Sequence, residues 1–122
     1  MSNIPEYSVS EISKSIKSSL EKKYNRVKIR GEISGLMRAN SGHLYFNLKD
    51  EEATLSSIVW KGRANFLELL PEEGLEVIAA GKISTYMPRS NYNFIIDNIK
   101  IAGEGALLKL IEERKKKLKD LG

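Results

Sequence analysis

The residues with the most chemical potential lie between positions 36 and 50, in the stretch LMRANSGHLYFNLKD. This stretch contains the single histidine of the chain, His43, followed closely by the adjacent aromatic residues Tyr45 and Phe46. A histidine acts as a general acid or base when a nucleophile or a second ionisable group lies beside it. The chain has no cysteine and no Ser/His/Asp arrangement or nucleophile elbow. We therefore expect His43 to be a surface hydrogen-bonding residue.

Carboxylate groups are the next candidates for catalysis. One acidic run occupies positions 50–52 and a second pair positions 72–73, but both fall in expected turns, where solvated charge is the simpler interpretation. No spacing of residues gives a convergent set of metal ligands. The sequence GEG at 103–105 lacks the remainder of a phosphate-binding loop. We therefore predict no catalytic residue, no metal and no cofactor in this chain.

Length and composition limit the class of protein. A chain of 122 residues is long enough for one domain with its own core. Its hydrophobic content of 41% and charged content of 30% are ordinary for a soluble globular protein. No apolar run approaches the roughly 18 residues of a membrane span, and the N-terminus lacks a signal-peptide pattern. The absence of cysteine fits a reducing compartment, so we expect a cytoplasmic protein without membrane contact.

The charge is distributed unevenly along the chain. Residues 1–30 carry a net charge of +4, residues 31–102 a net charge of −2, and residues 103–122 a net charge of +2. Three segments of the middle part, 33–49, 53–67 and 77–96, contain no acidic residue. Their basic residues are Arg38, Lys49, Lys61, Arg63, Lys82 and Arg89. If these segments converge in space, they form a locally positive face.

Two amphipathic helices are expected to flank the middle part. Residues 7–24 predict the first helix, with Ser8 and Glu11 placed as a capping box. Its narrow apolar stripe consists of Val9, Ile12, Ile16 and Leu20. Residues 106–121 predict a second helix, supported by Glu–Lys pairs four residues apart.

The middle part predicts five strands. Alternating apolar and polar residues indicate strands at 26–35, 43–48, 54–61, 75–86 and 92–102. A short helix-like segment at 62–74 separates the third strand from the fourth. Small residues at 79–81 indicate a place where the backbone bends or approaches another strand closely. This order is typical of an all-β OB-fold, a five-stranded Greek-key barrel; an open sheet or an SH3-like barrel has the same number of strands.

In an OB-fold, ligands lie across the second and third strands and between the loops joining strands 1–2 and 4–5. Here these loops are GLMRANSG and YMPRSNY, and each carries one arginine among small polar residues. His43, Tyr45 and Asn47 share the outward parity of the second strand, while Trp60, Lys61 and Arg63 follow the third strand. Bases stack on aromatic side chains and phosphates meet cations in single-strand binding grooves.

Each aromatic residue also has an ordinary structural role to weigh against recognition. Phe46, Phe66 and Phe94 fall on core parity, so we expect them to pack inside the barrel. Tyr45 could stack on a base or simply cover the surface, and Trp60 could equally cap the end of the barrel. The joint placement of the arginines around one face favours binding.

At this level of detail the sequence resembles the N-terminal domain of exodeoxyribonuclease VII large subunits. The matching motifs are VSEI at 9–12, IRGEIS at 29–34, SGHLYFNLKD at 41–50, YMPR at 86–89 and GEGAL at 103–107. They occur in the right order and span most of residues 7–122.

The resemblance implies an OB-fold that binds single-stranded DNA for a nuclease whose catalytic region follows this chain. It also implies assembly of the intact enzyme with many copies of a small helical subunit. The motif match transfers a binding role to Arg38, Ser41, His43, Tyr45, Tyr86, Arg89 and Tyr92. The surface argument adds Trp60, Lys61 and Arg63, although Trp60 stands where the family pattern has phenylalanine.

The leading hypothesis is therefore a domain that holds single-stranded DNA, with little sequence preference, for hydrolysis by the intact exodeoxyribonuclease. We expect residues 1–25 to form a helical extension, residues 26–102 the OB-fold domain, and residues 103–122 a helix leading to the catalytic region. Two alternatives stay open: a module that docks other parts of its own enzyme, and an OB domain that binds RNA.

Overall fold

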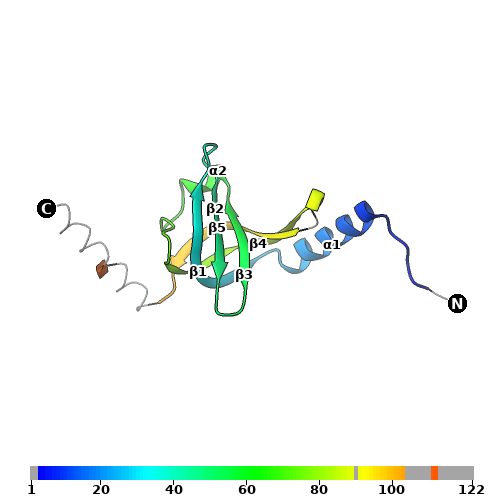
Figure 1. The fold of residues 1–122 in the computed structure, drawn as a ribbon, viewed down its shortest axis with the longest axis horizontal. Coiled ribbons are helices and arrows are strands. Elements are labelled where there is room, and N and C mark those ends of the chain that lie inside the picture. The colour runs from blue at the N-terminus through cyan, green and yellow to red at the C-terminus, as the bar shows by residue number, and fades with distance from the viewer. Residues whose placement is uncertain (1–2, 90, 104–110, 113–122) are drawn as a thin grey trace.

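The computed structural model describes residues 3–89, 91–103 and 111–112, and for Tyr86 and Met87 only the backbone. In chain order the elements are α1 (Val9–Lys23), β1 (Val27–Arg38), β2 (Leu44–Lys49), β3 (Thr54–Val59), α2 (Lys61–Ala64), β4 (Glu76–Tyr86), the 3-10 helix η1 (Met87–Arg89) and β5 (Asn91–Ile101). The strands form a closed barrel in the order β1-β2-β3-β5-β4 (Figure 1). The expected five-stranded OB-fold barrel, with an N-terminal helix and a short helix between strands 3 and 4, is confirmed.

Strand β1 is long enough to pair with β4 along its first half and with β2 along its second half. Its first half is antiparallel to β4, and its second half is antiparallel to β2. The register with β2 shifts between Ser34 and Met37, and such a β-bulge bends a strand and increases its twist. On the other side, β3 and β5 pair in parallel at only two positions, Ser57 with Phe94 and Ile58 with Ile95.

The core follows the alternation of the strands. On β2, Leu44, Phe46 and Leu48 are 2–3% exposed, while the intervening Tyr45 is 37% exposed. Phe94 on β5 is fully buried in the same core. The expected inward positions of Phe46 and Phe94 are therefore confirmed, because side chains two residues apart on a strand share one face.

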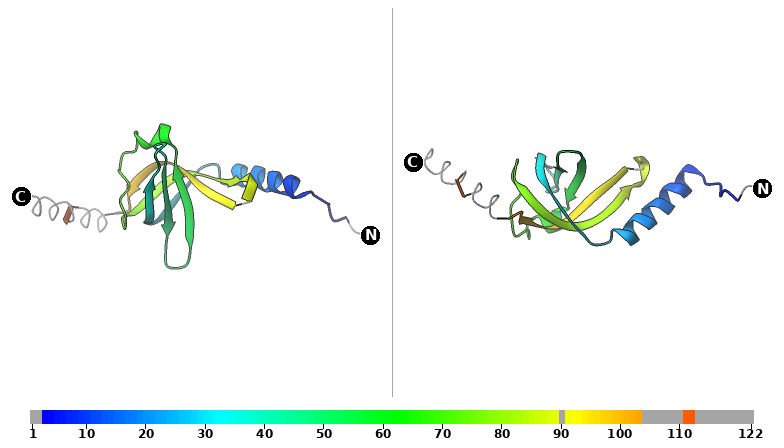
Figure 2. Two further views of the ribbon diagram at one scale, coloured as in Figure 1. Left: turned by 45° about the horizontal axis from the view of Figure 1, so that its top comes forward. Right: turned by 90° about the horizontal axis from the view of Figure 1, so that it is seen from below.

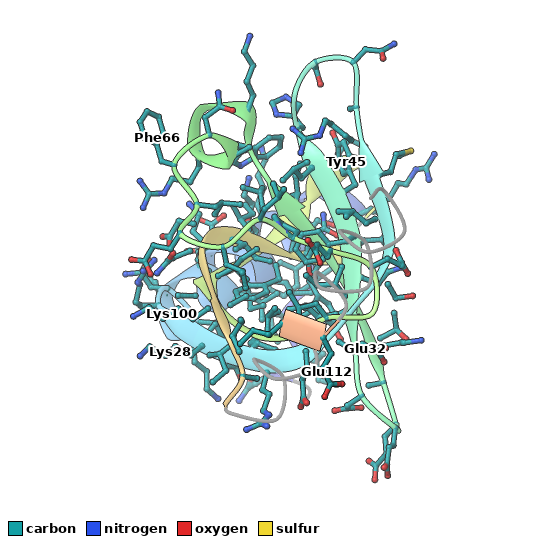
Figure 3. All side chains as sticks on the ribbon, turned by 90° about the vertical axis from the view of Figure 1, so that its left-hand side faces the viewer. Lys28, Glu32, Tyr45, Phe66, Lys100 and Glu112 are labelled. Atoms are coloured by element: carbon teal, nitrogen blue, oxygen red, sulfur yellow. The ribbon has the colours of Figure 1, made fainter. Side chains whose placement is uncertain are left out.

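The expected packing of Phe66 is wrong. Helix α2 ends at Ala64 instead of continuing to residue 74, so Phe66 lies beyond any strand or helix and is 71% exposed. Figure 3 shows its ring projecting from the segment after α2, away from Tyr45 on β2. Leu67 and Leu69 of the same segment pack against the core instead. Strand parity does not apply outside a strand.

Close approach of two backbones explains the small residues of β4. The register between β4 and β5 shifts between Ala80 and Gly81. A Cβ atom on Gly81 would lie 2.0 Å from the carbonyl oxygen of Ile95, so only glycine fits at this position. The expected close approach at 79–81 is confirmed.

Helix α1 lies beside the β4–β5 hairpin (Figure 2). Its N-terminus is capped as expected, because the backbone N–H of Glu11 donates to the Ser8 hydroxyl at 3.0 Å. Its C-terminal part is fixed to β4, because the backbone N–H of Ile83 donates to the Tyr24 carbonyl and the Ser84 hydroxyl donates to Glu21. No helix within residues 3–89, 91–103 and 111–112 could cross a membrane. The expected C-terminal helix lies outside the described residues, except for Ile111 and Glu112, which are helical.

Candidate nucleic-acid interface

A tight loop between β1 and β2 carries the first group of expected site residues. The backbone N–H of Ala39 donates to the His43 carbonyl, and that of Gly42 donates to the Ala39 carbonyl, both at 2.9 Å. These bonds hold the loop at one end of the barrel, close to α2 (Figure 1). Arg38 and Ser41 are exposed in it.

The stem of this loop is fixed by Glu73, which lies between α2 and β4. The carboxylate of Glu73 accepts hydrogen bonds from the backbone N–H groups of Leu36 and Gly35, both at 2.9 Å. Gly35 adopts a positive φ of 66° at the bulge of β1, a conformation that glycine adopts without strain. The N–H bonds, with a smaller contribution from Lys49, lower the pKa of Glu73 because they favour the charged carboxylate.

His43 joins the loop to the start of α2. Its Nδ1 atom accepts a hydrogen bond of 2.7 Å from the backbone N–H of Lys61. Its ring meets the Trp60 ring edge to face, with centroids 5.0 Å apart, and lies 6.4 Å from the Tyr45 ring centroid. The expectation that His43 is a hydrogen-bonding residue is confirmed. We call His43, Tyr45 and Trp60 the aromatic cluster.

The aromatic cluster is open to solvent and has one cation, Lys61, beside it. Trp60 is 47% exposed and Tyr45 37% exposed, which leaves ring surface free for a ligand. Lys61 follows Trp60 directly. Arg38 is exposed at the end of β1, but its cross-strand partner is the inward-facing Leu44, while Tyr45 pairs with Met37. Among the described residues, neither Arg38 nor Lys61 forms a salt bridge.

Arg63 lies two residues after Lys61 in α2 and reaches toward β5. Its Nε atom donates to the backbone carbonyl of Asp97 at 2.7 Å. The Asp97 carboxylate itself binds Arg26, and this hydrogen bond, followed by the charge attraction, raises the pKa of Arg26. Arg63 therefore borders the interface at its β5 side, with its side chain already engaged by the backbone.

The other three expected residues lie at the β4–β5 hairpin. Arg89 is exposed in η1, which contacts α1. Tyr92 is 61% exposed and lines a cavity of about 640 Å³ together with Leu20 and Tyr24. Tyr86 ends β4, but its side chain lies outside the described part of the chain. The structure thus brings the loop and α2 residues together and places the hairpin residues in a separate group.

The acidic run at positions 50–52 lies at the opposite end of the β2–β3 hairpin from the aromatic cluster. The Asp50 carboxylate accepts hydrogen bonds from the backbone N–H groups of Glu52 and Ala53, both at 2.9 Å, and these bonds lower its pKa. The interpretation of positions 50–52 as turn charge is confirmed for Asp50. In the described part of the chain, no three acidic or histidine residues gather as metal ligands.

A cavity of about 400 Å³ opens next to the aromatic cluster, and sequence patterns missed most of its lining. Besides Tyr45 and Trp60, it is lined by residues of β3, β4 and β5, among them Ser56, Thr85 and Asn93. Strand parity places Ser56 on the outward face of β3, yet only the pairing of β3 with β5 brings Asn93 beside it. That pairing joins residues far apart in sequence.

Comparisons with known proteins agree with this architecture. The family model described as "OB-fold nucleic acid binding domain" matches residues 7–100. The exodeoxyribonuclease 7 large subunit of Mesorhizobium japonicum is 51% identical over 121 residues, covering 98% of this chain and 23% of that protein. The same protein of Rhodospirillum centenum is 49% identical over 117 residues, covering 96% of this chain and 22% of its own length.

Solved structures with low sequence identity share the fold. Asparaginyl-tRNA synthetase from Pyrococcus horikoshii superposes with a TM-score of 0.52 at 12% identity, over 73% of this chain and 22% of that chain. The asparaginyl-tRNA synthetase of Entamoeba histolytica gives a TM-score of 0.51 at 13% identity, over 65% of this chain and 21% of that chain.

The family resemblance inferred from the sequence motifs is confirmed by these relatives. The chain spans slightly more than a fifth of the length of the large subunits that it matches. This chain therefore belongs to the family of OB-fold nucleic acid binding domains and is homologous to the corresponding part of exodeoxyribonuclease 7 large subunits.

Proposed function

We propose that this chain is the single-stranded DNA-binding domain of an exodeoxyribonuclease VII large subunit. It holds the substrate while the rest of the enzyme, outside this chain, hydrolyses the strand into oligonucleotides. The observation that carries this proposal is the aromatic cluster, whose Tyr45 and Trp60 rings are partly open to solvent and are accompanied by Lys61, which forms no salt bridge within the described residues. Stacking supplies about 1–3 kcal/mol per base, and the cations meet the phosphates.

The proposal includes the organisation of the intact protein. Residues 1–25 extend the OB-fold domain of residues 26–102, and residues 103–122 lead toward the catalytic region. The intact large subunit assembles with the small subunit of the enzyme. The catalytic residues belong to the part of the large subunit that lies outside this chain. The absence of cysteine supports a cytoplasmic location, where thiols stay reduced and disulfides are rare.

A titration of the chain with labelled single-stranded DNA, duplex DNA and RNA at two salt concentrations tests the proposal. We expect single-stranded DNA to bind most tightly, with an affinity that falls steeply as salt rises, because phosphate contacts release counterions. Tighter binding of RNA would favour the RNA alternative. Failure to bind any nucleic acid at low salt would overturn the proposal.

Matched aromatic variants locate the binding surface. Tyr45→Ala and Trp60→Ala should each weaken single-stranded DNA binding by roughly 1–3 kcal/mol, the value of a lost base stack. Phe66→Ala is the control, because Phe66 is 71% exposed but lies outside the aromatic cluster. Arg89→Ala and Tyr92→Ala then show whether the hairpin group contacts the same strand. Equal affinities for the Tyr45, Trp60 and Phe66 variants would contradict the site.

A second candidate function is docking within the same enzyme, and helix α1 favours it. Of its apolar stripe, Val9, Ile12 and Ile16 are 80%, 37% and 48% exposed, and only Leu20 packs against the core. The occupant we propose is the remainder of the large subunit, since the matched relatives are more than four times longer than the aligned part. Amide hydrogen exchange tests this: α1 should exchange more slowly in the full-length large subunit than in this chain, and equal rates would exclude docking.

A further inference from the structure

Strand β1 changes register halfway along its pairing with β2. Up to Ser34 the two strands run in one register, and from Met37, which pairs with Tyr45, they run in another. Two residues of β1, Gly35 and Leu36, therefore lie opposite position 46 of β2 alone. This arrangement is a β-bulge, and a bulge changes the direction of the side chains that follow it.

The extra residue decides which side chain of β1 lies beside Tyr45. Without it the first register would continue, and Leu36 would pair with Tyr45. Cross-strand partners share a face of the sheet, so Leu36 would then point outward and Met37 inward. The structure has the reverse arrangement, because Leu36 packs against the core and Met37 is 59% exposed. The bulge therefore sets the face on which each residue leading into the β1–β2 loop emerges.

A side chain accepts both N–H groups of this bulge. The backbone N–H of Gly35 donates to Oε2 of Glu73, and the backbone N–H of Leu36 donates to Oε1, each at 2.9 Å. Two successive N–H groups directed at one anion are an arrangement that favours negative charge. The positive φ of Gly35, 66°, permits it without strain. Glu73 thus supplies, from within the chain, the anion that the bulge requires.

The backbone on either side of the contact holds Glu73 in place. The N–H of Gly74 donates to the Ile33 carbonyl at 2.8 Å, and the N–H of Ile33 donates to the Leu75 carbonyl at 2.9 Å. These two bonds fasten the segment before β4 to β1 directly before the bulge. Lys49 adds a favourable charge interaction with the carboxylate. The carboxylate therefore reaches the bulge from an anchored backbone, and only its own side-chain torsions remain to be fixed.

We propose that Glu73 is a positioning residue for DNA binding: its carboxylate holds the bulge of β1 and thereby the register in which Met37 meets Tyr45. This inference rests on the proposed function and gives a part in it to an acidic residue that does not touch the ligand. It also predicts an effect of unusual sign. Removing an acid from a domain that binds a polyanion normally strengthens binding. Removing this acid should weaken binding, because the β1–β2 loop then loses its register.

Glu73→Gln tests the proposal on this chain, and Glu68→Gln is the matched control. Both variants remove one negative charge from the segment between α2 and β4, but Glu68 is exposed and accepts no hydrogen bond among the described residues. Fluorescence anisotropy with labelled oligothymidylate measures the affinity. Glu73→Gln should bind about 2- to 10-fold more weakly than the unmodified chain, as expected if about a tenth to a half of the molecules keep the competent register. Glu68→Gln should bind with equal or greater affinity.

Cross-strand nuclear Overhauser effects measure the register without DNA. In the unmodified chain the backbone protons of Met37 should contact those of Tyr45. In Glu73→Gln these contacts should weaken and contacts between Leu36 and Tyr45 should appear, while the contacts between β1 and β4 persist. A general loss of stability would not exchange one cross-strand partner for another. This measurement therefore separates positioning from a purely structural role.

A second pair of variants tests the proposal if Glu73→Gln does not fold. Gly35→Ala strains the bulge itself, since a φ of 66° disfavours a side chain, although the added Cβ would meet Asn47 Nδ2 at an ordinary 3.6 Å. Gly103→Ala also places a side chain at positive φ, 94°, but two residues after the end of β5. Gly35→Ala should weaken DNA binding, and Gly103→Ala should not.

The outcomes distinguish the two proposals. If the unmodified chain does not bind oligothymidylate, the proposed single-stranded DNA function fails. If it binds, and Glu73→Gln binds as tightly as Glu68→Gln, the function stands and the positioning role is wrong. Weaker binding of Glu73→Gln with unchanged contacts between Met37 and Tyr45 would also overturn the inference, because the register would then not depend on the carboxylate.

Discussion

Replacing Gly81 with alanine should be among the most damaging single-methyl changes in this barrel. The new Cβ would lie 2.0 Å from the carbonyl oxygen of Ile95, and 2.9 Å from both the Ile95 carbonyl carbon and the Ile96 Cα. All three atoms belong to the backbone of β5, so no side-chain rotation relieves the contact. Real Cβ atoms do not approach other atoms closer than 3.0 Å, so β4 and β5 must separate locally.

The expected cost follows from that separation. A displacement of about 1 Å is enough to lengthen ladder hydrogen bonds beyond their normal range of roughly 2.7–3.2 Å. Overpacking a core by one methyl group costs about 1–3 kcal/mol, and a buried backbone group left unpaired costs about 1–3 kcal/mol more. Alanine recovers roughly 0.5–1 kcal/mol because it restricts the unfolded chain. We expect Gly81→Ala to lower the free energy of unfolding by about 3 kcal/mol.

Urea denaturation followed by the fluorescence of the single tryptophan, Trp60, measures this effect. With a urea dependence of about 1.5 kcal/mol per molar, the midpoint should fall by about 2 M. Gly62→Ala is the matched control, because its Cβ position in α2 has no atom within 4 Å apart from its chain neighbours and its own helix backbone, so it should be neutral or stabilising by up to about 1 kcal/mol. A Gly81→Ala variant within about 0.5 kcal/mol of the unmodified chain would refute the close approach of the two strands.

Three other predictions test the core, the loop stem and the histidine. Phe94→Ala should cost about 3–5 kcal/mol because the ring is fully buried, whereas Phe66→Ala should stay within about 0.5 kcal/mol in the same urea assay. Glu73→Gln should destabilise the chain at neutral pH, since its carboxylate accepts two backbone hydrogen bonds and its pKa is lowered on folding. Because the pKa of Glu73 is lower in the folded state, the stability it contributes is present above the unfolded pKa and is lost as the pH falls through the folded pKa. The difference in stability between Glu73→Gln and the unmodified chain should therefore vanish under acidic conditions. A difference that does not depend on pH would contradict the role of Glu73. Neutral His43 should carry its proton on Nε2, because Nδ1 accepts from Lys61, and a ¹⁵N spectrum with the opposite tautomer would contradict that bond.

Local alternation was sufficient to predict the β2 strand. Leu44, Phe46 and Leu48 face the core and Tyr45 faces out, because the two-residue period of a strand depends only on neighbouring residues. The small residues of β4 were equally informative, since glycine inside a strand marks a bend or a close approach. These features require no knowledge of which strands pair.

The segment after β3 shows why apolar residues alone did not define a helix. The prediction extended a helix over 62–74, but α2 ends at Ala64. Leu67 and Leu69, two residues apart, both pack against the core, while Leu70 is 55% exposed. A helix would have placed positions 66, 69 and 70 on one face. Packing of this segment against the barrel determined its conformation, and local propensity did not.

The candidate site was predictable to the extent that it is local. Tyr45, Trp60 and Lys61 were proposed from their place on two consecutive strands, and the structure puts them around His43. Asn93 was not proposed, because nothing near it in the sequence marks it as a neighbour of β3. Its position depends on the parallel pairing of β3 with β5, which joins two strands that are far apart in the sequence.

Charge segregation reconciles the middle part of the chain with a nucleic acid ligand. Residues 31–102 have a net charge of −2, which by itself argues against a polyanionic partner. Five of the nine acids in this part, Glu32, Asp50, Glu51, Glu52 and Glu76, line a cavity of about 960 Å³ near the β2–β3 turn, while the cavity beside the aromatic cluster has no acid in its lining. Because exposed charges are screened over about 10 Å at 0.1 M salt, a strand at the aromatic cluster responds to nearby cations such as Lys61 more than to the distant acids. The sign of the local field, and not the sum over the domain, therefore determines what this end of the barrel can bind.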